Sequence, residues 1–599
     1  MVGCFTLINE EVGKLSSLIV LIAAAVYLVA YFTYGKGLEK NLVKADPQRK
    51  TPAVALKDGV DYYPAHPFVL YGHHFASIAG AGPILGPALA MAWGWFPTLI
   101  WVWLGNIFIG SIHDYLSLMA SVRYEGKSIQ YVAGRIMSKR TSYIFELFVY
   151  FALILVVAAF TVTLAQTFTA NPAIPTASIG FIIAAVITGY LMYRTKLGMR
   201  VGTIIGIILL VISIWIGYHV PIKLSTHTWY VLTLIYIVCA ASLPVWILLQ
   251  PRDYLNAYIL WVGLILGGIS FLVLAKGFAF PAFTTFSPNI VGGKPSPFWP
   301  AVPLVVACGA LSGFHSLVAS GTSSKQLDSE LSGLLVGYGS MFTEGFLSTI
   351  VVTSIAVFGF SVLEGAAEKI SGMGINLDML KAGGAYLGQN YLKAAGAVGG
   401  PLGPFYSGYA KGLEEVLGIP FKLGRTFAGL WVSCFVLTTL DTTNRLARFA
   451  WTEIFEPLRK SSPGLHAVIT NRWIASLVAA VLGVGLAWGG ALNLLWPAFA
   501  GANQLLASIA LLTVAIWATN VQKASSGYRL AVLIPGLFLW VTVTAALLWF
   551  LIVVVPAQTG MVKYSVGTIV AVMLLLNFLL LQDFFKALKR GPEALEVTK

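Results

Sequence analysis

Charged side chains are scarce in this chain of 599 residues. Asp, Glu, Lys and Arg make up 10% of it, against roughly 25% in an average soluble domain. Hydrophobic residues make up 58% of the chain. So little charge argues against an ordinary soluble protein, and so much apolar sequence predicts an all-α polytopic membrane protein.

Cysteines are few, and common nucleotide and metalloprotease motifs are missing. The four cysteines are scattered and three lie inside apolar runs, so neither a disulfide framework nor a zinc spacing is present. The chain has no GxxxxGK[ST] motif, which argues against ATP-driven transport by this chain alone, and no HExxH motif. We therefore expect no cofactor, no bound metal and no enzymatic activity.

Acidic residues are fewer than basic ones, 24 against 38, which gives a formal net charge of +14. The basic residues lie in short loops beside apolar runs and form no continuous stripe, a pattern of membrane topology and not of nucleic-acid binding. Assigning the basic loops to the cytoplasm predicts an external N-terminus and a cytoplasmic C-terminus. The first apolar run, 15–34, has only Lys14 as a basic leader and lacks a small-residue cleavage site, so we interpret it as a retained helix.

About fifteen apolar runs are long enough, at about 20 residues each, to cross the roughly 30 Å of hydrocarbon in a bilayer. They lie near 15–34, 68–92, 95–121, 141–170, 177–193, 201–219, 229–250, 255–275, 301–322, 336–360, 426–446, 472–490, 494–516, 530–555 and 565–586. The Gly-rich segment 361–425 is expected to form an extracytoplasmic cap with amphipathic pieces at 377–392 and 408–417.

The stretch 72–91, GHHFASIAGAGPILGPALAM, has the apolar content of a span but holds three glycines and two prolines between 80 and 87. Pro removes a backbone donor and Gly costs about 1 kcal/mol against Ala, so this helix should be interrupted. Such a break must be buried in protein or line a cavity. The amides of a second half-helix starting near Pro83 would attract a carboxylate. The predicted substrate-binding residues here are Ser77, Ala79, Gly80, Ala81, Gly82 and Pro83.

The run 229–250 contains Ser242 and Pro244 in the phrase CAASLPVWILLQ and enters from the opposite side. Two interrupted helices of opposite direction are typical of inverted-repeat transporters, with the substrate between them. We therefore add Ser242 and Pro244 to the substrate site and predict a five-plus-five core with repeats at 68–219 and 229–446. The alternative is that Pro244 only kinks a packing helix.

Ionisable residues inside spans cost several kcal/mol unless they are paired, and they mark a functional site by default. Asp114 in the run 95–121 is a coupling candidate, although it could simply tie two helices together. His113 adjoins it but points about 100° away on a helix, so it could be a packing histidine. His73 and His74, on the cytoplasmic side of the first break, are candidates for a proton relay or gate.

Two further spans carry candidates for coupling or gating. His315 lies among serines at helical spacing in the run 301–322 and, with a reference pKa of about 6.5, could titrate during transport. Thr322 and Ser323 offer an alternative set of oxygen ligands for sodium. Asp441 precedes Arg445 by four residues, the favourable order for a helix ion pair, which could form a gate or only a snorkelling anchor.

Four phrases resemble the carbon starvation protein A (CstA) family: GHHFASIAGAGPILGP, TPAVALKDGVDYYPAHPFVLYG, HDYLSLMASVRYEGKSI and TTLDTTNRLARF. The resemblance covers about residues 45–450. It implies an inner-membrane secondary transporter related to the amino acid, polyamine and organocation superfamily, for peptides or for pyruvate with protons. The family's signature positions correspond here to His73, His74, Gly80, Gly82, Pro83, Asp114 and Asp441.

The leading hypothesis is therefore a LeuT-like secondary transporter in the plasma (inner) membrane, which takes up a small carboxylate such as pyruvate, or short peptides, with protons or alternatively sodium. Its partners would be the substrate and the bilayer, without nucleic acid. A nutrient sensor without net transport and a membrane-embedded metal enzyme are the alternatives. Residues 1–67 would form an N-terminal helix and cytoplasmic loop, and 447–599 additional spans.

Overall fold

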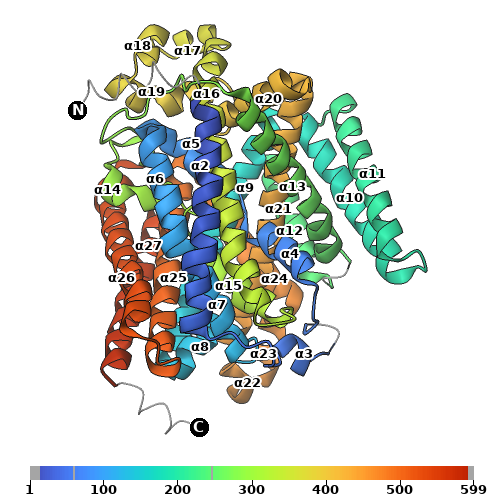
Figure 1. Ribbon diagram of the computed structural model, residues 1–599, viewed down its shortest axis with the longest axis vertical. Helices are drawn as coiled ribbons and strands as arrows, with labels where there is room; N and C mark the ends of the chain where they lie inside the picture. Colours follow the sequence, from blue (N-terminus) through green and yellow to red (C-terminus); the bar gives the residue numbers. More distant parts are fainter. Residues whose placement is uncertain (1–13, 59–60, 245–246, 591–599) are drawn as a thin grey trace.

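The computed structural model describes residues 14–58, 61–244 and 247–590. Almost all of its regular structure is helical, and the long helices run side by side along the molecule (Figure 1). Among the described residues, twelve helices are long and apolar enough to cross a membrane, and a thirteenth span is bent by 48° between α4 (Pro67–Ile78) and the helix that follows it. The predicted all-α polytopic membrane protein is confirmed.

The remaining elements of the bundle have these bounds. The long helices are α2 (Leu15–Ala30), α6 (Trp95–Gly105), α7 (Ser111–Arg123), α9 (Lys139–Ala170), α10 (Ala173–Arg194), α11 (Gly198–His219), α13 (Leu249–Leu274), α16 (Ser340–Glu364), α21 (Phe421–Ile454), α24 (Arg472–Gly489), α25 (Leu492–Ile516), α26 (Ser526–Trp549) and α27 (Met561–Arg590). The shorter ones are α3 (Pro52–Ala55), α5 (Gly82–Ala90), α8 (Ile129–Ile136), α12 (Thr226–Ser242), α14 (Phe298–Ala301), α15 (Gly313–Gly321), α17 (Ala367–Gly372), α18 (Leu377–Lys381), α19 (Gly384–Gly396), α20 (Gly403–Leu417), α22 (Leu458–Ser461) and α23 (Pro463–Ile469). Helices α6 and α7 join through a π-helical turn, Asn106–Gly110, into one span.

The run 229–250 is not an interrupted span, so that prediction is wrong. Helix α12 ends at Ser242, the next span begins at Leu249, and Pro244 is exposed in the connection. The physical reason is local: Leu243, which precedes the proline, adopts an extended backbone as residues before proline prefer to do. Pro244 therefore ends a helix, and the kinked-helix alternative is also wrong.

The second interrupted segment is instead the run 301–322, which the sequence suggested was a continuous span. The chain leaves the helical conformation after a short turn at Val302–Leu304, and α15 begins only at Gly313. The stretch between them, VVACGALS, is non-helical and buried. Because this run is broken and α12 is only 17 residues long, neither is among the twelve or thirteen described helices that are long and apolar enough to span a membrane, and the predicted number of about fifteen is not confirmed.

The segment 361–425 divides into two parts. Helices α17, α18 and α19 lie together at one end of the bundle, as a cap would, while α22 and α23 lie at the opposite end (Figure 1). Helix α20 does not belong to the cap, because it packs among α13, α16 and α21 and most of its residues are buried. Its glycines permit this position: a side chain on Gly408 would meet the backbone of Ser354.

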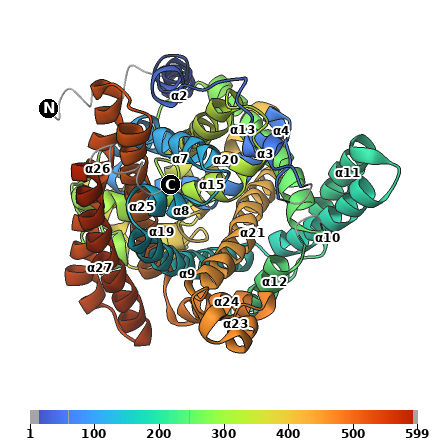
Figure 2. The ribbon, with the colours of Figure 1, turned by 90° about the horizontal axis from the view of Figure 1, so that it is seen from below.

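The centre of the bundle is built around two long helices, α9 and α21, which pack against each other. Helix α12 packs against α24, and α25, almost completely buried, packs against α9 and α15. Helices α10 and α11 form a hairpin that projects from one side in both views (Figures 1 and 2). The residues of the two breaks, 79–81 and 305–312, are buried within this bundle.

Candidate functional site

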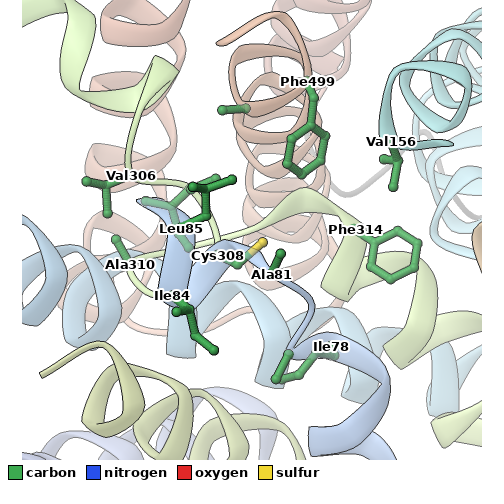
Figure 3. Packing of buried hydrophobic residues seen from close by; sticks show 14 of the residues in the cluster. Ile78, Ala81, Ile84, Leu85, Val156, Val306, Cys308, Ala310, Phe314 and Phe499 are labelled. Atoms are coloured by element: carbon green, nitrogen blue, oxygen red, sulfur yellow. The ribbon is translucent and has the colours of Figure 1, made fainter. Parts of the chain in front are cut away.

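The two interrupted segments face each other at the centre of the bundle. The first break comprises Ala79, Gly80 and Ala81, between α4 and α5. Figure 3 shows Ala81 close to Cys308 of the second break, with Phe314 and Phe499 beside them. A side chain on Gly82 would overlap the Cys308 side chain, and one on Gly86 would lie 2.9 Å from the carbonyl oxygen of Val305. Glycine is therefore required where the breaks touch.

The carbonyl groups of the second break are satisfied by side chains from distant helices. Trp496 Nε1 donates to Val305 O at 3.0 Å, and Gln504 Nε2 donates to Val306 O at 2.5 Å, both from α25. Asn106 Nδ2 donates to Gly309 O at 3.0 Å. Non-helical backbone is tolerated at membrane depth when protein groups replace the missing hydrogen bonds, as they do here.

The start of each second half-helix also has an anchor. Ser348 on α16 donates to the carbonyl oxygen of Pro83 at 2.8 Å, in the first turn of α5. Asn503 on α25 accepts from the backbone amide of Phe314 at 2.8 Å, in the first turn of α15. Both half-helices are thus held by polar side chains of continuous spans, which fixes where their free amides point.

Four buried ionisable side chains lie beside the breaks and form a chain across three helices. His113 Nδ1 lies 2.7 Å from Asp114 Oδ1, and His315 Nδ1 lies 2.8 Å from Asp114 Oδ2. His315 Nε2 lies 3.6 Å from a carboxylate oxygen of Glu344. All four side chains are completely buried. The sequence predicted three of these residues but not that His113 and Asp114 are hydrogen-bonded to each other.

Glu344 was missed by the sequence analysis, although a signal was present. It is the only charged residue in the apolar run 336–360, and an ionisable residue in such a run deserves the same interpretation as Asp114. Neither of its oxygens has a hydrogen-bond partner among the described residues. Cys308, His315 and Glu344 also offer donor atoms that lie within 4.8 Å of one another, a set that could in principle hold a metal ion.

Asp441 is paired with a residue other than the predicted one. Its carboxylate accepts from Arg252 of α13, with one bond at 3.1 Å and a shorter one, and from Tyr236 at 3.0 Å. Arg445 instead donates to the carbonyl oxygens of Ala240 and Leu243, at 3.0 and 2.7 Å. The predicted Asp441–Arg445 helix pair is therefore wrong, because the fully buried Arg252 occupies both carboxylate oxygens.

The other predicted residues are more dispersed. His74 Nδ1 lies 2.7 Å from Ser323 Oγ, and His73 Nε2 is buried without a partner among the described residues. Ser77 donates to the backbone of its own helix, as does Thr322. Ser242 lies at the end of α12, 3.4 Å from the Arg472 carbonyl oxygen. Ser242 and the exposed Pro244 thus lose the basis on which we assigned them to the substrate site.

Two features lie at opposite ends of the candidate site. A small pocket of about 10 Å³, room for about one water molecule, lies on the α17–α19 side and is lined by Leu85 of α5, Thr163 of α9 and Tyr406 of α20. At the other end, the buried carboxylate of Glu330 accepts from Arg49 at 3.1 Å and from Arg123 at 2.8 Å. Ion pairs therefore close the chain at the Glu330 end, and a small pocket lies at the opposite end.

Comparison with known proteins gives a consistent set of relatives. Residues 15–546 match the family described as carbon starvation protein CstA. The chain is 31% identical to the peptide transporter CstA of Bacillus subtilis, over 94% of this chain and 95% of that one. It is 30% identical to the pyruvate/proton symporter BtsT of Escherichia coli, over 89% of this chain and 80% of that one. Among solved structures, MhsT in complex with L-phenylalanine aligns with a TM-score of 0.44 and 12% identity, over 81% of this chain and 98% of that chain.

Proposed function

Because the chain belongs to the carbon starvation protein CstA family, we propose that it is a secondary active transporter that takes up a small carboxylate or a short peptide together with protons. The observation that carries the proposal is the meeting of two interrupted segments in the buried centre of a membrane-spanning bundle. Such breaks form substrate sites in transporters because they expose backbone amides and carbonyls at membrane depth.

The substrate would lie against the first break, at Ala79, Gly80, Ala81, Gly82 and Pro83. Its carboxylate would face the positive end of α5 near the amides of Ala81 and Gly82, since Pro83 has no amide and those of Ile84 and Leu85 donate to Ala81 O at 3.1 and 2.8 Å. Thr439 of α21 and Phe160 of α9 border the same place, since a side chain on Gly80 would meet both. The backbone amides would bind the carboxylate group of a small substrate, and the Thr439 side chain and the Phe160 ring would contact its short apolar part.

Protons are favoured over sodium as the coupling ion. A relative of 30% identity is named a pyruvate/proton symporter. Titratable groups are abundant at membrane depth: His73, His74, His113, Asp114, His315 and Asp441 remain our coupling and gating candidates, together with Arg445. Thr322 and Ser323 remain the sodium alternative.

The repeats are best redrawn around the breaks that the structure contains. The first would run from α4 to α13 with the α10–α11 hairpin inserted, and the second from α14 to α25 with 361–420 inserted, in place of 68–219 and 229–446. This division gives each repeat five spans, the first of them interrupted. It also makes equivalent helices neighbours, α9 with α21 and α12 with α24.

We further propose that the chain lies in the plasma (inner) membrane with the α17–α19 end outside. Most of the basic residues of the loops then face the cytoplasm, and so does the end of α27. Uptake would proceed from the pocket beside Leu85 past the breaks to the end closed by Glu330.

The deciding experiment is uptake into proteoliposomes, with pyruvate and a dipeptide each tested under an imposed pH gradient and under a sodium gradient. We expect accumulation of at least one substrate with the pH gradient, inside alkaline, and none with sodium alone. Binding without accumulation would contradict transport. Sodium-driven accumulation that ignores the pH gradient would contradict the choice of ion.

A further inference from the structure

We propose that the coupling proton binds to Glu344 and is passed to His315, a site that deepens the proposed function and rests on it. Glu344 lies near the start of α16, inside the continuous span Leu334–Glu364, with no exposed surface. An ionised carboxylate in that position, with neither oxygen hydrogen-bonded to a described residue, would cost several kcal/mol. The carboxyl group is therefore suited to the protonated form in the conformation that the structure shows.

The orientation of His315 makes it the acceptor for this proton. Its Nδ1 lies 2.8 Å from Asp114 Oδ2, so a neutral ring that donates Nδ1–H to this carboxylate leaves the Nε2 lone pair free. Nε2 lies 3.6 Å from Glu344 Oε2 and has no hydrogen-bond partner among the described residues. A small approach of α15 and α16 would bring the two atoms within hydrogen-bond distance.

The transfer balances without a further reactant. The O–H bond of Glu344 breaks and an N–H bond forms at His315 Nε2, which leaves a carboxylate and an imidazolium. The imidazolium then lies between two carboxylates, Glu344 and Asp114, which stabilise it. The other titratable groups nearby are Tyr27 of α2 and Cys308 of the second break, which face Glu344, and His74 of α4, which faces His315.

The proton site is connected to both breaks by hydrogen bonds. Ser348 lies one helical turn after Glu344 on α16 and donates to the Pro83 carbonyl oxygen at 2.8 Å. Asn106 bridges the carbonyl oxygens of Gly309 and Met341, at 3.0 and 2.7 Å, and so joins the second break to the turn of α16 before Glu344. A shift of α16 on loss of the proton would therefore move the substrate cradle.

The test uses Glu344→Gln, which keeps the shape and neutrality of the protonated side chain but cannot exchange a proton. With one proton per substrate anion, a gradient of one pH unit sustains about tenfold accumulation. We expect Glu344→Gln to lose this accumulation while substrate exchange at equal pH stays within about threefold of wild type. Retained exchange also shows that the variant is folded. Glu364→Gln on the same helix, whose exposed carboxylate pairs with Lys381, is the matched control and should behave as wild type.

Three outcomes would overturn the assignment. Glu344→Gln could accumulate substrate under a pH gradient as wild type does. Alternatively, Glu344→Gln could lose exchange and accumulation equally while Glu344→Asp, which keeps a titratable carboxyl, fails to restore the response to the pH gradient, which would make Glu344 structural. Thirdly, purified wild type could hold a stoichiometric divalent metal that Cys308→Ser removes, which would assign these side chains to a metal.

These experiments distinguish an error in the proposed proton coupling from an error in the assignment of the proton site to Glu344. If wild-type proteoliposomes do not respond to the pH gradient at all, proton coupling itself is wrong. If wild type responds and Glu344→Gln does so equally, only the site is wrong. As a direct readout, substrate added to detergent-solubilised wild type in weak buffer should change the bound proton count, and Glu344→Gln should abolish that change.

Discussion

Ser348 and Pro83 join a continuous span to the first break through a hydrogen bond of 2.8 Å. The Pro83 carbonyl oxygen is buried in the first turn of α5, so without the hydroxyl it would be left unsatisfied, at a cost of about 1–3 kcal/mol. We expect Ser348→Ala to raise the KM of uptake by about fivefold or more, with little loss of protein yield. Ser354→Ala is the control, because the Ser354 hydroxyl donates only within its own helix. An unchanged KM would mean that this bond does not position the cradle.

Gly82 should tolerate no side chain while Cys308 is present. A methyl group there would overlap the Cys308 side chain and force the two breaks apart, so Gly82→Ala should abolish uptake while membrane insertion persists. Cys308→Gly removes the obstructing atoms, and the double variant should recover part of the activity, a coupling that a double-mutant cycle would measure. Gly485→Ala is the control, since nothing lies near that position. Wild-type uptake by Gly82→Ala would remove the substrate site from this stretch.

The first break could be predicted from sequence because its causes are local. Proline and glycine change the conformational preference of their own backbone and, for proline, that of the preceding residue. The residues of the stretch 72–91 are therefore sufficient to predict that its helix is interrupted. The same reasoning misread Pro244, because a proline just after a short helix and a proline within a long one look alike in an apolar run. A proline is tolerated within a long helix only where the backbone groups that it leaves without a hydrogen bond find other partners, and the sequence alone does not show whether they do.

The second break depended on partners far away in the chain, which is why it could not be predicted. The carbonyl groups of Val305 and Val306 are satisfied by Trp496 and Gln504, almost two hundred residues later. Likewise, the four-residue spacing of ion pairs on a helix predicted that Asp441 pairs with Arg445, whereas its partner in the structure, Arg252, lies 189 residues away in the sequence. Glu344 could have been predicted from the sequence, because the rule that identified Asp114, that an ionisable residue inside a span marks a functional site, applies to it equally.

The Arg252–Asp441 pair should dominate the stability of this part of the bundle. Both side chains are fully buried, and removal of one partner from such a pair typically costs about 3–5 kcal/mol. Arg252 also pairs with the buried Asp253 at 2.8 Å, so Arg252→Gln leaves two carboxylates without their cation, whereas Asp441→Asn leaves Arg252 one partner. We expect both variants to lower the thermal unfolding temperature in detergent, Arg252→Gln more strongly. Combining them should recover only part of the loss, because Asp253 stays without Arg252. Arg445→Gln should cost less, because it removes only hydrogen bonds to two carbonyl groups. Equal losses for Arg252→Gln and Arg445→Gln would contradict this assignment.

Asp114 should matter to transport more than to folding. Its two oxygens accept from two histidines, His113 and His315, and an amide can offer only one acceptor in their place. Hydrogen bonds to charged groups contribute about 1.5–3 kcal/mol, so Asp114→Asn should lower the uptake rate by about tenfold or more, while the yield of folded protein falls much less. Asp583→Asn is the control, because Asp583 of α27 also accepts a buried hydrogen bond, from Thr141 of α9, and is not part of the chain of ionisable residues beside the breaks. Parallel losses of uptake and yield would return Asp114 to a structural role.

Glu330 should hold the route closed at the end opposite the pocket. Its buried carboxylate accepts from Arg49 and Arg123 and so ties the segment before α3 and the end of α7 to the chain that follows α15. Glu330→Gln keeps the shape but removes the charge, and a loss of about 1.4 kcal/mol would make opening about tenfold more frequent. We expect a cysteine in place of the buried Ser323, in a chain whose native cysteines are replaced by alanine, to react correspondingly faster with a water-soluble thiol reagent. Glu456→Gln, which affects only the pairs of a half-exposed carboxylate with Arg459 and His466, is the control. Unchanged labelling would mean that the ion pairs fix the loops without gating the route, because a carboxylate that closes a pathway must, when neutralised, let water in.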